Sequence, residues 1–547
     1  MERDGLLDAN RTQVLIAGGG PVGMTLALEL ASHGIRTIVV ERNSTTTRHP
    51  KMDLTNGRSM ELYRRLGFAS ILREIGAPAD NKFDTTWVTK PGGPVLHTFS
   101  YPSPNDQRQE ARRLNDGTRT LEPPLRISQI MLEPALKDVL DRNPFVDLRF
   151  GWAFESFQQD DQGVTSTIVN PQTGRTETVR SDYLAGCDGG GSLVRQQLDI
   201  GMEGKYQIRW RYMVHFKSKA RSRVAPYGIV WHLQCPTGVL IAQDDDDTWT
   251  LHGPVDEDVA AEDLDPRARV REEFGEDFED FEIGVANPFW YHMVVAEDYG
   301  RGRVWLAGDA VHQVIPSGGY GMNTGVGDAV DLGWKLSAIL NGWAGPDLLE
   351  SYEAERRPIA LQNRAMVYAH GEARSKILAL FDQAKEKGDY HADTPAGEAL
   401  RAEIAVGIAA VGNLENEAWG IEHGYRYRNS PAICHEPDEP PFDVARCDPT
   451  TWPGARLPHV YLEDDTPIYD HLGQEFTLLA FAGADPGDFA NAAKDLNIPL
   501  LIAQIGQFNP LFERRLLLVR PDHHVAWRGD AAPDRAEAIL RQVTGRR

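Results

Sequence analysis

Hydrophobic and polar positions follow a clear order in residues 14–42. A short apolar run, Val14–Ala17, precedes three glycines, a stretch from Pro21 to Ser32 that is apolar on most faces, and a second apolar run, Thr37–Val40. Short apolar runs of this kind are typical of buried strands, and a helix that is apolar on most faces is expected to pack against a sheet. The pattern therefore predicts a strand, a turn, a helix and a second strand of one parallel sheet.

The same order returns twice further along the chain. Residues 183–200 and 303–340 each predict a buried strand, a glycine-rich turn and a helix, and strands are also predicted over Val146–Phe150 and Val164–Val169. These segments belong together because each can add a strand or a covering helix to the first sheet. We assign one discontinuous Rossmann-like domain to residues 1–80, 126–200 and 291–385.

The remaining segments have different patterns. Residues 201–290 alternate aromatic and polar positions, which predicts an antiparallel sheet with one covered face, and residues 81–125 are expected to join it. Residues 386–456 are predicted to be a helical and irregular connection. Residues 457–547 have a strand–helix–strand order followed by a hairpin and a helix, and resemble a thioredoxin-like domain without CxxC. His523 and His524 lie in that hairpin and are expected at the surface. The predicted fold class is α/β.

Composition narrows the possible partners. The 547 residues include 57 basic and 80 acidic side chains, a formal net charge of −23, which argues against nucleic acid and anionic membranes as partners. The N-terminus has no apolar signal segment, and no run is long enough to span a membrane, so a cytoplasmic location is expected. The four cysteines have no metal-ligand or disulfide spacing, which fits a reducing compartment. They are Cys187, Cys235, Cys434 and Cys447.

The first glycine-rich turn carries the first chemical signal. Gly18, Gly20 and Gly23 form GxGxxG directly after a predicted strand, and Glu41 ends the next strand. Glycines allow a pyrophosphate to approach the backbone at a helix N-terminus, and an acid at this spacing suits the ribose hydroxyls of an adenine dinucleotide. The alternative is an ordinary glycine-rich turn.

Three motifs together make the signal specific. GxGxxG is followed by Asp188–Gly189 after one later strand and by Gly308–Asp309 after another. This order resembles the class A flavoprotein aromatic monooxygenases, which have the para-hydroxybenzoate hydroxylase fold. The resemblance covers about residues 14–357. The thioredoxin-like C-terminal segment resembles the subgroup of phenol hydroxylase and 2-hydroxybiphenyl 3-monooxygenase, whose members bind FAD.

The resemblance implies roles for individual residues. Asp309 would bind a ribityl hydroxyl of FAD, and the loop 316–323 would pass under the isoalloxazine ring, with a helix N-terminus stabilising the anionic reduced flavin. Asp188 would lie near the pyrophosphate, although it could instead cap a helix. The full set of expected cofactor-binding residues is Gly18, Gly20, Gly23, Glu41, Arg42, Arg126, Gln129, Asp188, Gly189, Gly308, Asp309, Gly319, Gly321, Met322 and Asn323.

A catalytic base is expected because a phenol becomes a far better nucleophile as phenolate. By resemblance, Asp53 holds this position in the stretch HPKMDLTNGRSMELYRRLG. An apolar surrounding is expected there, since desolvation would raise the pKa of Asp53 enough to accept a phenol proton. Pro316 is expected to present its carbonyl at the interface of flavin and substrate. Lys51 departs from the arginine of many relatives. Trp231, His232 and Tyr291 are expected as pocket walls, with ordinary packing as the alternative.

The sequence thus predicts an enzyme that hydroxylates a phenolic aromatic compound, ortho to an existing hydroxyl, with FAD, NADPH or NADH, and O2. The resemblance implies a flavin C4a-hydroperoxide as the oxygenating species and a homodimer as the assembly. The alternatives are a reductase or halogenase of the same fold, or a non-catalytic flavin-binding protein. The halogenase signature WxWxIP is absent. No metal site is expected, since the acidic run Asp244–Asp247 fits a solvated turn.

Overall fold

The computed structural model describes residues 10–546. Its central sheet has eight strands, in the order β18-β19-β10-β1-β2-β7 with β9 and β8 continuing from β10. Neighbouring strands from β19 to β7 are parallel, so their carboxyl ends lie at one edge. The parallel strands are β1 (Arg11–Ala17), β2 (Thr37–Glu41), β7 (Val146–Phe150), β10 (Thr176–Gly186) and β19 (Val304–Leu306). The others are β8 (Ala153–Asp160), β9 (Gly163–Val169) and β18 (Gly300–Arg301).

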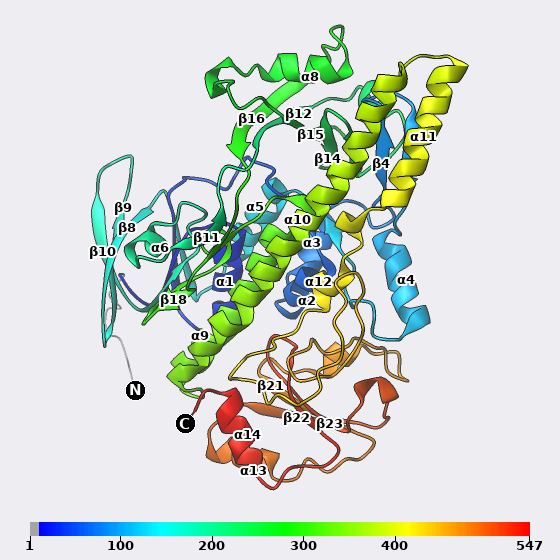
Figure 1. Cartoon of the computed structure of the whole chain (residues 1–547). Coiled ribbons are helices and arrows are strands. Elements are labelled where there is room, and N and C mark those ends of the chain that lie inside the picture. The colour runs from blue at the N-terminus through cyan, green and yellow to red at the C-terminus, as the bar shows by residue number, and fades with distance from the viewer. Residues whose placement is uncertain (1–9, 547) are drawn as a thin grey trace.

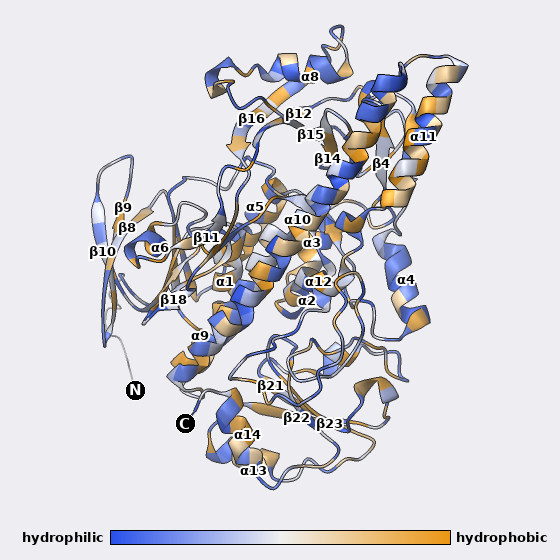
Figure 2. Cartoon of the chain, viewed as in Figure 1, coloured by the Kyte–Doolittle hydropathy of each residue, from blue (hydrophilic) through white to orange (hydrophobic). Residues whose placement is uncertain are grey.

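Long helices cover the central sheet. Helix α1 (Pro21–Ser32) packs against α9 (Tyr320–Leu340) and α5 (Gln129–Asp141). Helix α10 (Glu350–Lys387) runs diagonally across the molecule, and its far end packs against α11 (Pro395–Val411). Hydrophobic and hydrophilic residues alternate along both of these helices (Figure 2), because each has one face on protein and one on solvent.

A second sheet of seven strands has the order β16-β12-β15-β14-β13-β4-β5. Most pairs are antiparallel, as the sequence predicts, but β13 and β4 pair in parallel. Helix α8 (Pro266–Phe274) covers one face of this sheet. Helix α4 (Pro104–Leu114) was not expected, since its residues are nearly all polar. The strands are β4 (Thr85–Val88), β5 (Val95–Phe99), β12 (Trp210–Lys217), β13 (His232–Cys235), β14 (Gly238–Ala242), β15 (Thr248–Pro254) and β16 (Glu282–Trp290).

The C-terminal segment forms a four-stranded sheet in the order β22-β21-β23-β24. Strands β21 (Phe476–Phe481) and β22 (Leu500–Ile505) are parallel, and the other pairs are antiparallel. Helices α13 (Phe489–Asp495) and α14 (Ala536–Val543) pack against each other beside the sheet, at the bottom of Figure 1. The hairpin is β23 (Leu516–Val519) and β24 (Val525–Gly529). The element order is the predicted one, and the thioredoxin-like assignment stays a prediction.

The hairpin of the C-terminal sheet is buried, not exposed. His523 and His524 are 4% and 0% exposed, so the expectation of a surface position was wrong. The reason is their neighbour Arg520, which inserts between the central helices and donates to Glu355 of α10 at 2.6 Å and to Asp331 of α9 at 2.9 Å. Ionic contacts therefore join the C-terminal segment to the central domain.

A cluster of three carboxylates at this junction is paired with two cations. Asp331, Glu355 and Asp522 lie within reach of one another, but Arg520 donates to all three, and Lys335 donates to Asp331 and Glu355 at 2.7 and 2.6 Å. A guanidinium and an ammonium group thus occupy the space that a metal ion would need.

In the described part of the chain, no helix has the length and apolar character needed to cross a bilayer.

Candidate active site

The three sequence motifs meet at the carboxyl edge of the central sheet. Gly18 follows β1, Glu41 ends β2, Asp188 follows β10 and Asp309 follows β19. These strands are adjacent and parallel, so turns far apart in the sequence become neighbours. Ligands of open α/β sheets bind at this edge.

The glycines of the first motif are required by close backbone contacts. Gly18 has φ of +107°, and a Cβ there would lie 2.2 Å from the carbonyl oxygen of Cys187. A Cβ on Gly23 would lie 2.0 Å from the carbonyl oxygen of Gly18. Gly20, by contrast, has nothing within 4 Å of its Cβ position, at the N-terminus of α1. The turn is tight on its inner side and open on the side where a phosphate would bind.

Glu41 and Arg42 lie next to this turn. The Gly19 N–H donates to Glu41 Oε2 at 3.0 Å, and Asn43 donates through its backbone N–H and side chain to Oε1. Glu41 therefore holds the glycine turn against β2 and remains partly exposed, while Arg42 is exposed. Their contact with an adenosine moiety stays a prediction, and Glu41 also has a structural role that the sequence did not reveal.

Asp188 supports the start of α6 (Leu193–Gln197), whose N-cap residue is Ser192. Its Oδ2 accepts from the backbone N–H groups of Leu193 and Val194 at 2.7 and 3.2 Å, and its Oδ1 accepts from Ser192. Burial raises its pKa even though these hydrogen bonds oppose the shift. The neighbouring Gly189 has φ of +83° and open space at its Cβ position. Asp188 thus shapes the turn. This geometry agrees with its alternative role at the start of a helix, and a pyrophosphate contact stays a prediction.

The Gly308–Asp309 turn is held from behind by a residue that the sequence did not single out. The Gly308 N–H donates to Asp328 Oδ2 at 3.1 Å, and His312 Nε2 lies 2.9 Å from the same oxygen. Arg356 donates to Asp328 Oδ1 at 2.8 Å. Although burial opposes it, Arg356 and His312 lower the pKa of Asp328, which therefore stays ionised. Asp309 itself is exposed, so its carboxylate is available to a ligand.

The loop 316–323 lies beside the segment that carries Asp53. Asn323 Nδ2 donates to the carbonyl oxygens of Leu54 and Gly319, and its Oδ1 accepts from the Asn56 N–H at 3.0 Å. Gly319 has φ of +66° and Gly321 has open space at its Cβ position. Pro316 is exposed, and its carbonyl accepts from the Gly319 N–H at 3.0 Å. Met322 is partly buried in the first turn of α9. Within the first turn of α9, the Cβ position of Gly321 is therefore open, while the Leu54 side chain lies 3.5 Å from that of Gly319.

Arg126 and Gln129 lie beside the segment that carries Asp53. Strand β6 (Leu125–Arg126) pairs with β3 (Leu54–Thr55). Arg126 is 3% exposed and donates to Asp245 Oδ1 at 3.1 Å, while its Nε and Nη1 have no partner. Gln129 donates to Glu133 at 2.6 Å. The acidic run forms a turn, as expected, but Asp245 is paired with Arg126 and not solvated. A buried guanidinium with unused donors is suited to an anionic ligand.

Asp53 meets two of the three expected wall residues. Its Oδ2 accepts from Trp231 Nε1 at 2.6 Å and lies 3.1 Å from His232 Nε2. Burial would raise the pKa of Asp53, but the contacts with His232, Trp231 and Arg126 outweigh it and lower the pKa. The expectation of an apolar surrounding was therefore wrong. Tyr291, the third residue, lies between β16 and the next strand, under the guanidinium of Arg211 at 5.7 Å.

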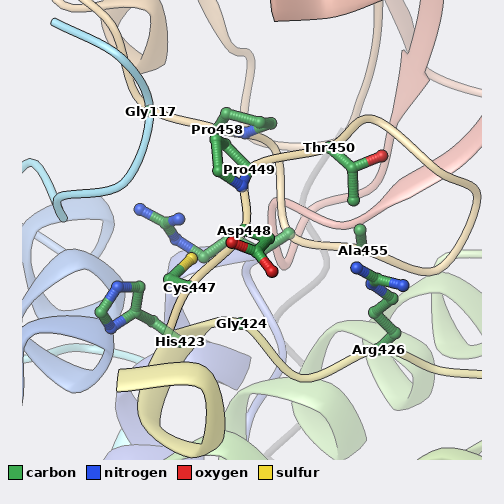
Figure 3. Close-up of a pocket in the computed structure, with 11 residues that line it drawn as sticks. Gly117, His423, Gly424, Arg426, Cys447, Asp448, Pro449, Thr450, Ala455 and Pro458 are labelled. Atoms are coloured by element: carbon green, nitrogen blue, oxygen red, sulfur yellow. The ribbon is translucent and has the colours of Figure 1, made fainter. Parts of the chain in front are cut away.

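Two internal cavities lie away from these motifs. One, shown in Figure 3, measures about 10 Å³ and is bordered by His423, Cys447 and Arg426, which is room for one water molecule. The other measures about 270 Å³ and lies between α10 and residues 426–429. Neither includes an expected site residue, and the chemistry is assigned to the sheet edge where the motifs meet.

Fold and site together define a class of flavoprotein. Residues 11–366 match the FAD binding domain family, and residues 450–546 match the aromatic-ring hydroxylase C-terminal domain. The chain belongs to this family and is an FAD-dependent monooxygenase of the aromatic-ring hydroxylase type. No comparison supports the alternative of a halogenase, a reductase or a non-catalytic protein.

Individual relatives align over nearly their whole length. The FAD-dependent monooxygenase apdD of Emericella nidulans is 36% identical over 98% of this chain and 90% of its own. The 2,4-dichlorophenol 6-monooxygenase of Delftia acidovorans is 29% identical over 97% and 98%. The structure of the flavin-dependent monooxygenase PieE with FAD and substrate superposes with a TM-score of 0.88 at 31% identity, covering 99% of this chain and 100% of that one.

The residues present fit FAD. The Cβ positions of Gly20, Gly189 and Gly321 are open, Arg126 has unused buried donors, and the Asp309 carboxylate is exposed. Together they offer N–H donors and a guanidinium for a pyrophosphate, a carboxylate for a hydroxyl, and a helix N-terminus, open at Gly321, for a ring that becomes anionic.

Proposed function

We propose that this enzyme hydroxylates a phenolic ring at the position ortho to its hydroxyl, using NADPH or NADH and O2. The observation that supports this most directly is the contact of Asp53 with His232 beside the flavin loop. A paired acid and histidine at this place can remove a phenol proton, and a ring without an acidic hydroxyl has no need for such a pair. The name of the dichlorophenol monooxygenase agrees with a phenolic substrate.

In this proposal His232 is the base and Asp53 positions it. Because Asp53 has a lowered pKa, it is a weak proton acceptor but a good partner for the His232 Nε2–H. The Nδ1 atom of His232 is buried and has no hydrogen-bond partner among the described residues. In this proposal it is the atom that accepts the phenol proton, and the substrate must reach it for the transfer to occur. Trp231 stacks on the His232 ring at 4.0 Å between centroids and fixes its orientation. Bound FAD, reduced by NAD(P)H, supplies the activated oxygen that the ring attacks.

The cofactor contacts are also proposals. Gly18, Gly20 and the N-terminus of α1 would hold the pyrophosphate, and Arg126 would donate to it. Asp309 would accept from a ribityl hydroxyl. The first turn of α9, from Gly321 to Asn323, would direct its N–H groups at the flavin ring and stabilise the reduced anion.

The test is substrate-stimulated oxidation of NADPH and NADH by the purified holoenzyme across a panel of phenols, with product quantified and its hydroxylation position determined. Stimulation with stoichiometric ortho-hydroxylated product supports the proposal. Hydroxylation of non-phenolic rings at equal rates, or no turnover with any phenol, contradicts it.

The assembly and domain division complete the proposal. A homodimer and a thioredoxin-like C-terminal domain are proposed from the resemblance, and the domain bounds are those given from the sequence. Light scattering on the purified protein tests the dimer, and a molar mass equal to one chain contradicts it.

A further inference from the structure

The seven-stranded sheet has two chemically different faces. Tyr212, Val214 and Phe216 of β12 belong to the apolar cluster beneath α8. Because side chains alternate along a strand, Arg211 and Met213 lie on the opposite face. That face is not covered by α8, and it is the face on which Asp53 contacts the sheet.

Strand register shows which polar residues share the uncovered face. Met213 of β12 lies opposite His252 of β15, and Val239 of β14 lies opposite both His252 and Gln234 of β13. His232 is two residues before Gln234, so it points to the same side. One surface therefore carries four polar residues from three strands, among them the Asp53 partner His232. The other three are Arg211, His252 and Gln234.

A second cation reaches this surface from α10. The Arg374 guanidinium donates to the Gln234 side chain and to the carbonyl of Gly238, both neutral acceptors, and lies 5.3 Å from the ring centroid of Trp87. Burial lowers its pKa below the ordinary arginine value. Arg374 is partly buried. A cation that is partly removed from water and lacks a carboxylate partner is costly, and an anionic ligand would relieve that cost.

Arg211 also has a guanidinium nitrogen that is available to a ligand. It interacts with the Tyr291 ring and hydroxyl, and its Nε is buried with no partner. Within residues 10–546 neither guanidinium forms an ion pair with a carboxylate. Arg211 lies over the Tyr291 ring, and Arg374 contacts Gln234 on the same face of the sheet. Burial raises the pKa of Tyr291, and both cations oppose that shift.

The charges around these arginines leave room for one more anion. Asp53 is occupied by Trp231 and His232. Glu415 attracts Arg374 from a distance, but its Oε1 accepts from the Gly318 N–H. Burial and, to a smaller extent, the charge of Arg211 lower the pKa of His252 to about 4, so His252 is neutral at pH 7.

We propose that Arg211 and Arg374 bind an anionic oxygen group of the substrate. This inference rests on the proposed function and makes it more specific: the substrate is a phenol with a second, acidic group, placed so that its hydroxyl reaches His232 while its anion lies against the two guanidinium groups. A carboxylate and an ionised enol share this chemistry.

The first experiment measures binding to the holoenzyme through the change in flavin absorbance. The probes are the three hydroxybenzoates and their methyl esters, together with a phenol bearing an acidic 1,3-diketone and its enol methyl ether. At least one acid should bind about tenfold or more tightly than its neutral partner. The carboxylate pairs and the diketone pair show which anion is preferred. Equal affinities in all pairs, or no acid binding, overturn the inference.

The second experiment uses Arg211→Gln and Arg374→Gln, with Arg374→Lys as a conservative variant. Each glutamine variant should lose about tenfold or more of the acid's affinity and little of the ester's. Arg267→Gln is the matched control, because Arg267 lies on α8 and is ion-paired with Glu279. Unchanged acid–ester affinity ratios in both glutamine variants contradict the inference.

The failure of this inference can be told apart from the failure of the proposed function. If phenols turn over without any preference for the acid, only this inference fails. If no phenol turns over, the proposed function fails, while binding still tests the arginines.

Discussion

The contact between Asp53 and His232 predicts a specific pattern of mutational effects. In the wild type, the Asp53 Oδ2 atom lies 3.1 Å from His232 Nε2 and 2.6 Å from Trp231 Nε1. In Asp53→Asn the His232 Nε2–H keeps an oxygen acceptor, but the negative charge of the carboxylate is lost. His232→Gln removes the Nδ1 nitrogen that accepts the phenol proton in the proposed mechanism. A positioned base contributes about 10²- to 10⁴-fold, so His232→Gln should lose about that much hydroxylation rate and Asp53→Asn somewhat less.

The two residues should not act independently. If Asp53 works through His232, the double variant should be about as slow as His232→Gln alone, because removing the base also removes the role of the residue that orients it. A multiplicative loss would show that Asp53 acts on the substrate directly. Flavin content and flavin reduction by NAD(P)H should stay near wild type in all three variants.

The assay is single-turnover oxidation of the reduced holoenzyme in the presence of O2, with product and hydrogen peroxide quantified. Substrate acidity provides the control: a nitrophenol that is already ionised at the assay pH should lose much less rate in the variants than phenol does. A wild-type rate for His232→Gln with phenol, or an equal loss for both substrates, would refute the assignment of His232 as the base.

Three further predictions concern the cofactor site and stability. Asp309→Ala should release FAD, and stoichiometric flavin in the purified variant would argue against the ribityl contact. Asp328→Asn should weaken FAD binding although Asp328 does not contact FAD, because the amide cannot accept all three contacts that hold the turn before Asp309. An equal FAD Kd for variant and wild type would contradict this. Although burial opposes it, hydrogen bonds with Glu29 and Glu475 raise the pKa of His33 to about 9. Its contribution of about 3 kcal/mol should be present in full below pH 6.5 and lost as pH rises through about 9, so the Tm advantage of wild type over His33→Gln should shrink across this range.

Local pattern was sufficient for the nucleotide-binding edge. The apolar run before Gly18 and the glycine spacing describe a tight turn between a strand and a helix, and this depends only on neighbouring residues. Backbone contacts confirm the need for glycine, since the Cβ of Gly18 would lie 2.2 Å from the carbonyl oxygen of Cys187. The order of strands and turns followed because parallel strands bring their carboxyl ends together.

The surroundings of individual charges were decided by tertiary structure. Asp53 is 178 and 179 residues away from Trp231 and His232, and no local pattern reports that these side chains meet. For that reason the sequence predicted an apolar surrounding and a raised pKa where the structure has two hydrogen bonds and a lowered one. Asp328 and the pair of Arg211 and Arg374 were missed for the same reason.

Burial of polar residues in the C-terminal hairpin shows the same limit. A hairpin with two histidines has the composition of a surface turn, yet Arg520 is fully buried between carboxylates from α9 and α10. The sequence by itself determined the backbone turns, the order of the elements and the family of the enzyme, because these depend on short-range spacing. Only the tertiary structure decided which charges are paired, which donors stay free and which histidine lies against Asp53, because those properties depend on contacts between distant segments.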